Sequence, residues 1–238
     1  MRRIVERKTF SGAVCEIEEY PISDKVINVE KAEPHPRFKS EEERKRHRDG
    51  ISRRNHVRRF NRNFSPSSLY VTLTFDDKHY VNNFPDARRI EDNYYRCVKR
   101  RCPDAKIMMY MGRGRKTGRI HFHMVCDGVP EKVIKKLWKY GSIIRIEHLR
   151  SHNHYNGVDH GQDYTGLANY LFAHWTEEQG GHRWKQSRNL CRPDQETAKV
   201  IKRLQRPPRA PKGYMFVESK DTEWGYLYFK YVRIPPRE

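Results

Sequence analysis

The chain has 238 residues, with 49 lysine and arginine residues against 30 acidic residues and a formal net charge of +19. This length suits one domain with a full core plus appendages, and the charge indicates a polyanionic partner, most simply nucleic acid. Five scattered cysteines without a Cys-x2-Cys pair argue against a zinc ribbon and a disulfide framework. No apolar run reaches membrane-spanning length and no signal peptide heads the chain, so we expect a cytoplasmic protein.

The N-terminal segment predicts a β-hairpin followed by basic helices. Two alternating runs, 4–10 and 13–20, flank Ser11-Gly12, and this dipeptide is a hairpin signal. Residues 39–63 are dominated by arginine, lysine and glutamate, which indicates one or two basic helices. Such helices are equally compatible with a solvated surface and with contacts to a phosphate backbone.

The clearest strand covers residues 69–75. Its apolar residues alternate with Tyr70, Thr72 and Thr74, which therefore share the opposite face. Residues 85–101 follow with an apolar stripe at helical spacing and predict a helix.

A second hairpin is predicted from two strands, 106–111 and 119–125, around the turn 112–118. The glycines of the turn serve the turn itself, but its cations are better explained by a phosphate backbone. We therefore predict four DNA-binding residues here: Arg113, Arg115, Lys116 and Arg119.

The strand 119–125 alternates polar and apolar residues, so His121 and His123 point to the same face. Two neutral imidazoles at this spacing on a rigid strand are well placed to bind one divalent metal ion. On the spacing alone, such a pair more often marks an ordinary solvent-exposed strand face than a metal site.

A short helix over 131–140 and a strand over 142–147 are predicted next. A histidine-rich segment follows, and its spacing matches no structural zinc pattern, so we favour a polar loop there. Its histidines are His148, His152, His154 and His160.

Residues 163–178 predict a helix with two tyrosines in different environments. At 100° per residue, Tyr164 lies on the apolar stripe and belongs to the core. Tyr170 lies well away from the centre of that stripe and has no packing reason to be there. Alone, it would be an ordinary surface tyrosine.

The remaining chain begins with the basic segment 180–190, in which we predict that Lys185 and Arg188 contact nucleic acid. Residues 192–213 indicate a short helix and a linker. Two terminal strands then follow, which we expect to pair with the N-terminal hairpin: 214–218 and 226–232.

Three stretches, 70–76, 118–123 and 164–171, resemble the motifs of HUH endonucleases and stand in the same order. Within that superfamily the chain resembles the rolling-circle replication initiator (Rep) proteins of plasmids, phages and integrated bacterial elements. The resemblance implies an α+β fold with a central antiparallel sheet of about five strands, helices on one face, and the histidine pair on the open face.

The expected organisation has three parts. An N-terminal hairpin and basic helical segment covers residues 1–63, and an HUH endonuclease domain covers residues 64–190. A linker and C-terminal strands, 191–238, are expected to pack with the N-terminus and to form a β-hairpin appendage.

The resemblance implies that Tyr170 attacks a phosphodiester of single-stranded DNA, forms a 5′-phosphotyrosine intermediate and initiates rolling-circle replication. His121 and His123 would hold Mn²⁺ or Mg²⁺, and imidazole ligation favours Mn²⁺. Family members often carry a lysine three or four residues after the tyrosine. Here these positions are Ala173 and His174, and His174 is the candidate substitute in the catalytic set.

The third metal ligand is less clear from sequence. Family members often place a glutamate on the strand before the histidine strand, but residues 111–113 here contain no carboxylate. The candidates are Glu147 and Gln162, together with Asp163 and Asp76.

The implied partners are single-stranded DNA or an origin hairpin, and a host helicase and polymerase, in bacterial cytoplasm. A non-catalytic single-stranded nucleic-acid-binding protein is the main alternative, supported by the departures at the lysine and glutamate positions. A metal-dependent phosphohydrolase that uses activated water is a third interpretation. It would need more carboxylates near the histidine pair.

Overall fold

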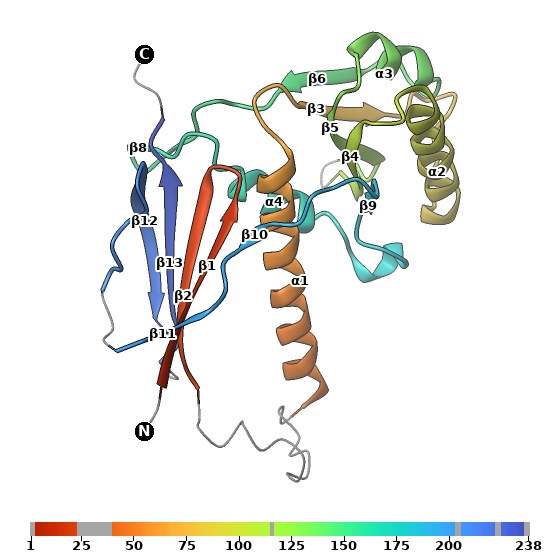
Figure 1. The fold of residues 1–238 in the computed structure, drawn as a ribbon. Coiled ribbons are helices and arrows are strands. Elements are labelled where there is room, and N and C mark those ends of the chain that lie inside the picture. Colours follow the sequence, from red (N-terminus) through yellow and green to blue (C-terminus); the bar gives the residue numbers. More distant parts are fainter. Residues whose placement is uncertain (1–2, 23–39, 115–116, 203–205, 222–224, 236–238) are drawn as a thin grey trace. The chain divides into compact units, whose positions relative to one another are not determined.

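A computed structural model describes residues 3–22, 40–114, 117–202, 206–221 and 225–235 (Figure 1). The chain forms two compact units. The first unit comprises Met1–Arg62, His152–Asp163 and Arg192–Glu238, and the second comprises Asn63–Ser151 and Tyr164–Cys191.

The first unit contains an antiparallel sheet in the order β10-β1-β2-β13-β12, with β11 also paired to β1. Gly12 forms the predicted hairpin turn between β1 and β2 at a φ of +62°, and a Cβ there would lie 2.1 Å from the carbonyl oxygen of Asn61. Only glycine fits both conditions. β13 pairs with β2, so the C-terminal strand lies beside the N-terminal hairpin. The strands of this sheet are β1 (Arg3–Ser11), β2 (Val14–Ile22), β10 (Asp194–Gln195), β11 (Lys199–Ile201), β12 (Tyr214–Asp221) and β13 (Leu227–Arg233).

The histidine-rich segment of the first unit forms a small hairpin of β7 (His154–Tyr155) and β8 (Val158–Asp159). Within it, the His152 ring is held by the Asp159 carboxylate at 2.6 Å.

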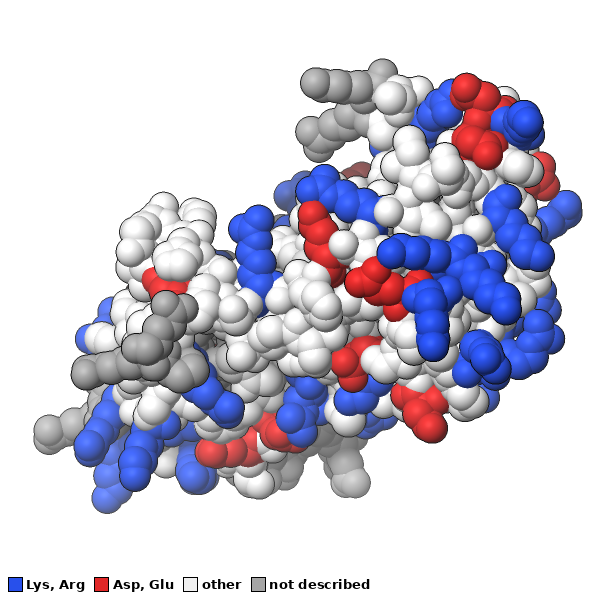
Figure 2. Space-filling view, turned by 90° about the horizontal axis from the view of Figure 1, so that it is seen from above, with Lys and Arg blue, Asp and Glu red and all other residues white. Residues whose placement is uncertain are grey.

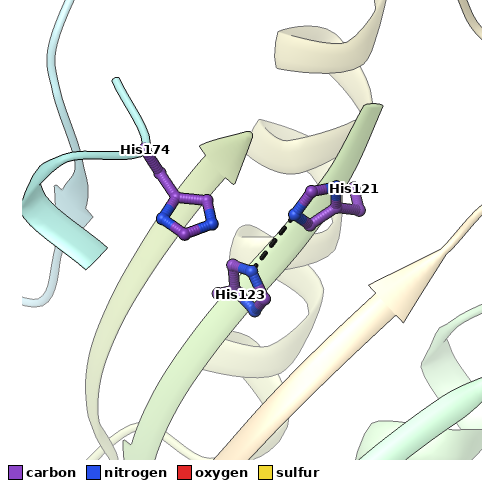
Figure 3. Close-up of side chains that lie close together, drawn as sticks. All are labelled: His121, His123 and His174. Carbon is purple, nitrogen blue, oxygen red and sulfur yellow. Dashed lines mark hydrogen bonds between the residues drawn. The ribbon is translucent and has the colours of Figure 1, made fainter. Parts of the chain in front are cut away.

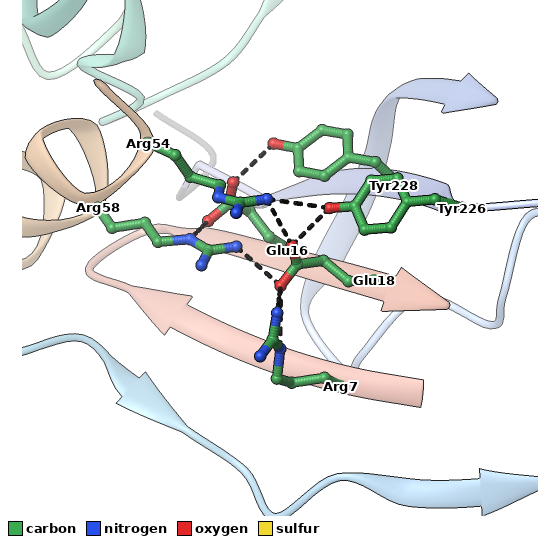
Figure 4. Close-up of polar contacts among 7 residues, drawn as sticks. All are labelled: Arg7, Glu16, Glu18, Arg54, Arg58, Tyr226 and Tyr228. Atoms are coloured by element: carbon green, nitrogen blue, oxygen red, sulfur yellow. Dashed lines mark hydrogen bonds and ion pairs between the residues drawn. The ribbon is translucent and has the colours of Figure 1, made fainter. Parts of the chain in front are cut away.

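Helix α1 (Glu41–Asn63) is attached to this sheet by buried ion pairs. Arg58 lies 2.5 Å from Glu16 and 3.1 Å from Glu18, and the side chains of all three are at most 8% exposed. Glu18 also binds Arg7 and Arg54, each at 2.9 Å (Figure 4). One fully buried carboxylate therefore joins three arginines from two elements.

Two tyrosine hydroxyls complete the contacts of these carboxylates. Tyr226 donates to Glu18 at 2.5 Å and Tyr228 donates to Glu16 at 2.8 Å (Figure 4). Burial alone would raise the pKa of Glu18, but the Tyr226 hydroxyl and the guanidinium groups lower it below its usual value. Glu18 is thus held as a carboxylate.

The second unit is an α+β arrangement around a five-stranded antiparallel sheet, in the order β6-β3-β5-β4-β9. The strand with the two histidines, β5, lies in the centre between β3 and β4. No helix within the described ranges is both long and apolar enough to cross a membrane. The elements are β3 (Leu69–Thr74), α2 (Phe84–Arg101), β4 (Lys106–Arg113), β5 (Ile120–Asp127), α3 (Glu131–Leu137), β6 (Ile144–His148), α4 (Thr165–Phe172), the 3₁₀ helix η3 (Glu177–Gln179) and β9 (Lys185–Gln186).

One face of this sheet forms the core with α2 and α3. Strand alternation places Val71 and Phe122 on this face, where they join buried residues of the two helices such as Val98 and Ile134. The opposite face carries the histidines, and α4 lies there, because the Tyr170 ring is centred 6.0 Å from that of His123. The expectation of helices on one face therefore holds for α2 and α3 but is wrong for α4.

Two predicted helices differ from the structure. The helix expected over 163–178 ends at Phe172, and after an extended Thr176 the chain continues as η3. The helix expected within 192–213 is absent from the described part of that segment, where β10 and β11 bond to β1. Pairing with a sheet edge there outweighs local helix propensity.

The buried ion pairs generate a prediction for stability. Arg58→Met keeps most of the apolar stem but removes the cation from two buried carboxylates, so we expect a loss of about 3 kcal/mol in the free energy of unfolding. Chemical denaturation followed by circular dichroism measures it.

The matched control is Arg48→Met on the same helix. Arg48 binds Glu41 at 3.0 Å, but its side chain is 59% exposed, so the change should stay within about 0.5 kcal/mol. Equal losses for the two variants would show that burial of the ion pairs does not stabilise α1 on the sheet.

Candidate metal centre and its tyrosine

Three histidines of the second unit converge on the face of the sheet opposite the core. His121 and His123 project from β5, and their Nε2 atoms are 3.1 Å apart. His174 follows the C-terminal end of α4, and one nitrogen from each ring lies within 4.8 Å of the others (Figure 3). Among the described residues, no other group of three histidine, cysteine or acidic side chains comes this close.

The spacing of the two β5 nitrogens suits a shared ion. With metal–nitrogen bonds of about 2.1 Å, a separation of 3.1 Å corresponds to an angle of about 95° at the metal. This angle is normal for two adjacent ligands of one ion. The rings are also centred only 4.8 Å apart and stand nearly perpendicular, so both can direct a lone pair to the same point.

Contacts at Nδ1 favour one tautomer of His121 and of His174. His121 Nδ1 is 3.4 Å from the carbonyl oxygen of Arg119, and His174 Nδ1 is 2.9 Å from that of Tyr170. A carbonyl oxygen only accepts, so these contacts are hydrogen bonds when the proton is on Nδ1. In this tautomer each Nε2 keeps a lone pair, as a metal ligand requires.

His123 is held by two hydroxyls of the neighbouring strand β3. Its Nδ1 lies 2.9 Å from the Tyr70 hydroxyl and 3.1 Å from Thr72 Oγ1. The Tyr70 ring also stacks on the imidazole, with centroids 5.5 Å apart and planes 19° from parallel. When His123 Nδ1 donates to either hydroxyl, its Nε2 is likewise free to bind a metal.

Burial favours the neutral form of the two histidines on β5. His123 is only 4% exposed, and burial, with smaller effects from His121 and His174, lowers its pKa to about 3. Burial also lowers the pKa of His121 below its usual value. Protons therefore do not compete for these two ligand nitrogens near neutral pH.

The position of His174 depends on Gly112 of β4. Gly112 pairs with His121 in the sheet, and a Cβ built on it would lie 2.5 Å from Cδ2 of His174. The same Cβ would lie 3.3 Å from His121 Nε2. The absence of a side chain at this one position lets the His174 ring approach the strand.

The two tyrosines differ as helical phasing predicts. Tyr164 is 3% exposed and its hydroxyl donates to the carbonyl oxygen of Arg150 at 3.0 Å. Tyr170 is 52% exposed, and its ring is centred 4.3 Å from that of His174. Tyr164 is thus a core residue, whereas Tyr170 stands at the open side of the histidine cluster.

The third member of the cluster is His174, which the sequence suggested as a substitute cation rather than as a ligand. The carboxylates considered as ligands lie outside the cluster. Glu147 on β6 binds Arg145 at 2.7 Å, and Asp76 holds a histidine of its own turn. Gln162 and Asp163 belong to the first unit.

Two of the predicted DNA-binding arginines have partners within the second unit. Arg113 donates to the carbonyl oxygens of Gly118 at 3.1 Å and Asn82 at 3.2 Å. Arg119 forms an ion pair with Asp77. Any contact with DNA would therefore compete with these interactions.

The other predicted cations divide into two groups. Lys185 on β9 pairs with Asp92, and burial lowers its pKa, while Arg188 is exposed. Arg115 and Lys116 lie outside the described residues.

Sequence reasoning missed the roles of Tyr70, Thr72 and Gly112. The alternation in β3 had placed both hydroxyls on one face, but only the register shows that Thr72 stands opposite His123. The need for glycine at position 112 appears only once the path of the chain after α4 is known.

No protein-family model, no curated protein and no solved structure matches this chain. Its function is therefore inferred from the geometry of the site and from the sequence motifs that form it.

Gly112→Ala should weaken metal binding by at least about tenfold, because the added methyl group displaces a ligand ring. Titration calorimetry with Mn²⁺ measures this affinity. Gly166→Ala is the matched control, since a Cβ there has nothing within 4 Å, and its affinity should be unchanged. If both variants bind Mn²⁺ like the parent protein, His174 is not a ligand.

Tyr70→Phe keeps the ring that stacks on His123 but removes one of its two hydroxyl partners. We expect the affinity for Mn²⁺ to fall about tenfold, the lower end of the range for partners of metal ligands. Tyr164→Phe removes a hydroxyl outside the cluster and serves as the control. An equal loss in the control would point to general destabilisation.

Proposed function

We propose that this chain is a metal-dependent endonuclease of the HUH type that nicks and rejoins single-stranded DNA through Tyr170. The observation that carries the proposal is the convergence of three imidazoles beside an exposed tyrosine. A non-catalytic binding protein has no need for this combination, because the histidine cluster and Tyr170 lie on the face of the sheet opposite the core.

The proposed reaction is a transesterification. The Tyr170 oxygen attacks the phosphorus of a phosphodiester, a bond from phosphorus to the tyrosine oxygen forms, and the bond to the 3′ oxygen breaks. The proton lost by tyrosine is balanced by one gained at the 3′ hydroxyl, and the 5′ phosphate stays on the protein. The reverse reaction, with a 3′ hydroxyl as the nucleophile, rejoins a strand.

The chain's own residues position this reaction. A tyrosine hydroxyl is mostly protonated near neutral pH and is a poor nucleophile. A divalent ion at the histidine cluster would neutralise the phosphate and polarise it for attack. Tyr170 lies four residues before His174, and its carbonyl oxygen binds the His174 ring. This contact fixes the position of the proposed nucleophile relative to the histidine cluster.

The donor set also bears on the choice of metal. Three imidazoles without a carboxylate in the cluster favour Mn²⁺, or another transition metal ion, over Mg²⁺, which prefers oxygen ligands. Of the two ions expected from sequence, Mn²⁺ is therefore the better candidate.

The wider features of the chain support the same proposal. The histidine strand is central in a five-stranded antiparallel sheet, as the resemblance to HUH endonucleases leads one to expect. The net charge of +19 suits a DNA substrate. Initiation of rolling-circle replication at an origin, with single-stranded DNA or an origin hairpin as partner, is the role that we propose for this activity.

The test is the covalent adduct itself. Tyr170→Phe removes only the attacking oxygen, so adduct formation and nicking should fall by more than about 1,000-fold while Mn²⁺ binding survives. His121→Ala should lose metal binding and nicking together. A pool of single-stranded oligonucleotides labelled at the 3′ end reports the adduct on a denaturing gel, because the protein retains the fragment with the 5′ phosphate.

Tyr164→Phe is the control and should form the adduct normally. Nicking by Tyr170→Phe without an adduct would indicate hydrolysis by water. If the unmodified protein binds the pool with Mn²⁺ present and never forms an adduct, it is a non-catalytic single-strand binder.

A further inference from the structure

Helix α2 presents a line of arginines to solvent. Arg89, Arg96 and Arg100 are spaced seven and four residues apart, which returns each to the same side of an α-helix. All three are exposed. The opposite side of the helix is buried in the core through Phe84, Ala87, Glu91, Tyr94 and Val98.

Helix α3 extends this positively charged surface. It lies beside α2, since the hydroxyl of Tyr94 donates to the carbonyl oxygen of Ile134 at 3.4 Å. Figure 2 shows that lysine and arginine predominate on the right of the view, where Figure 1 places α2 and α3. We define the basic face by three arginines of α2, two exposed lysines of α3 and one that follows α3: Arg89, Arg96, Arg100, Lys132, Lys136 and Lys139.

Little of this charge is neutralised within the protein. Arg89 binds Asp86 at 3.3 Å, but the other five residues of the basic face form no ion pair among the described residues. Cations in the last helical turn stabilise a helix, which accounts for Arg100 but not for Arg89 or Arg96. An external anion would compensate the remaining charge.

We propose that the basic face binds the phosphate backbone of duplex DNA. Arg89 and Arg100 are about 17 Å apart along the helix axis, a length that covers several phosphates of a duplex. Proteins that bind single strands add exposed aromatic rings for base stacking. Among the described residues, the exposed aromatic side chains are Tyr80, Tyr155, Tyr170 and Phe216. None of them belongs to α2 or α3.

The basic face and the histidine cluster lie on opposite sides of one sheet. α2 and α3 cover the core face, while His121 and His123 project from the other. A duplex on the basic face is therefore a different DNA segment from the strand that reaches Tyr170. The inference rests on the proposed function, because the bound duplex would be a double-stranded part of the same DNA whose single strand is nicked at Tyr170.

The experiment measures binding of the full-length protein to a short duplex of arbitrary sequence by fluorescence anisotropy over a range of salt concentrations. The triple variant Arg89→Gln, Arg96→Gln, Arg100→Gln should bind about 100-fold more weakly near 0.1 M salt. The slope of log affinity against log salt should fall by about 3, one for each lost phosphate contact.

The matched control is the triple variant Arg89→Lys, Arg96→Lys, Arg100→Lys, which keeps the charge and should bind the duplex within about threefold of the parent. Mn²⁺ affinity, measured in parallel, checks that the second unit is intact. If the glutamine triple does not fold, Arg96→Gln alone should lower the slope by about 1.

Three outcomes overturn the inference: unchanged duplex binding by the glutamine variants, a loss confined to single strands, or an equal loss in the lysine variant. None of them depends on nicking. A failure here is therefore distinguishable from a failure of Tyr170 to form an adduct.

Discussion

The candidate metal centre depends on one constraint: three imidazoles must stay neutral and turn the same nitrogen toward one another. Each Nδ1 is occupied, by the carbonyl oxygens of Arg119 and Tyr170 and by the hydroxyls of β3. Burial favours the neutral form of the two rings on β5. Without these partners the rings could rotate or protonate, and the Nε2 atoms would no longer converge.

The register of the sheet provides the hydroxyl partners of His123 and the space for His174. Thr72 stands opposite His123 on one side of β5, and Gly112 stands opposite His121 on the other. A slip of one residue in the first pairing would turn Thr72 to the core face, and a slip in the second would place a residue with a side chain opposite His121. The central place of β5 therefore determines both the site and its supporting groups, because an edge strand has a neighbour on one side only.

Sequence patterns predicted the elements whose environment follows from their own periodicity. The alternation in β3 and β5, the hairpin at Gly12 and the burial of Tyr164 against the exposure of Tyr170 are of this kind. The role of His174 is not, because it depends on where the chain leaves α4. The sequence predicts a regular helix through position 174, but α4 ends at Phe172 and Ala173 is its C-cap.

Long-range polar contacts were likewise invisible to sequence patterns. Composition predicts the exposed face of α1. The ion pair of Arg58 with Glu18, which attaches α1 to the sheet, joins residues forty positions apart in the sequence. The basic face was likewise not predicted, because it is formed by two helices that only tertiary packing brings together. In both cases the arrangement is fixed by tertiary packing, which periodicity does not encode.

One carbonyl oxygen has a further consequence. The oxygen of Tyr170 that holds the His174 ring belongs to the same residue whose side chain would carry DNA. In the proposed reaction, tension on a strand tethered to this tyrosine would pass through a single peptide unit to His174, a candidate ligand of the ion. The proposed nucleophile and the third histidine of the cluster are therefore mechanically linked, and a load on one would be felt at the other.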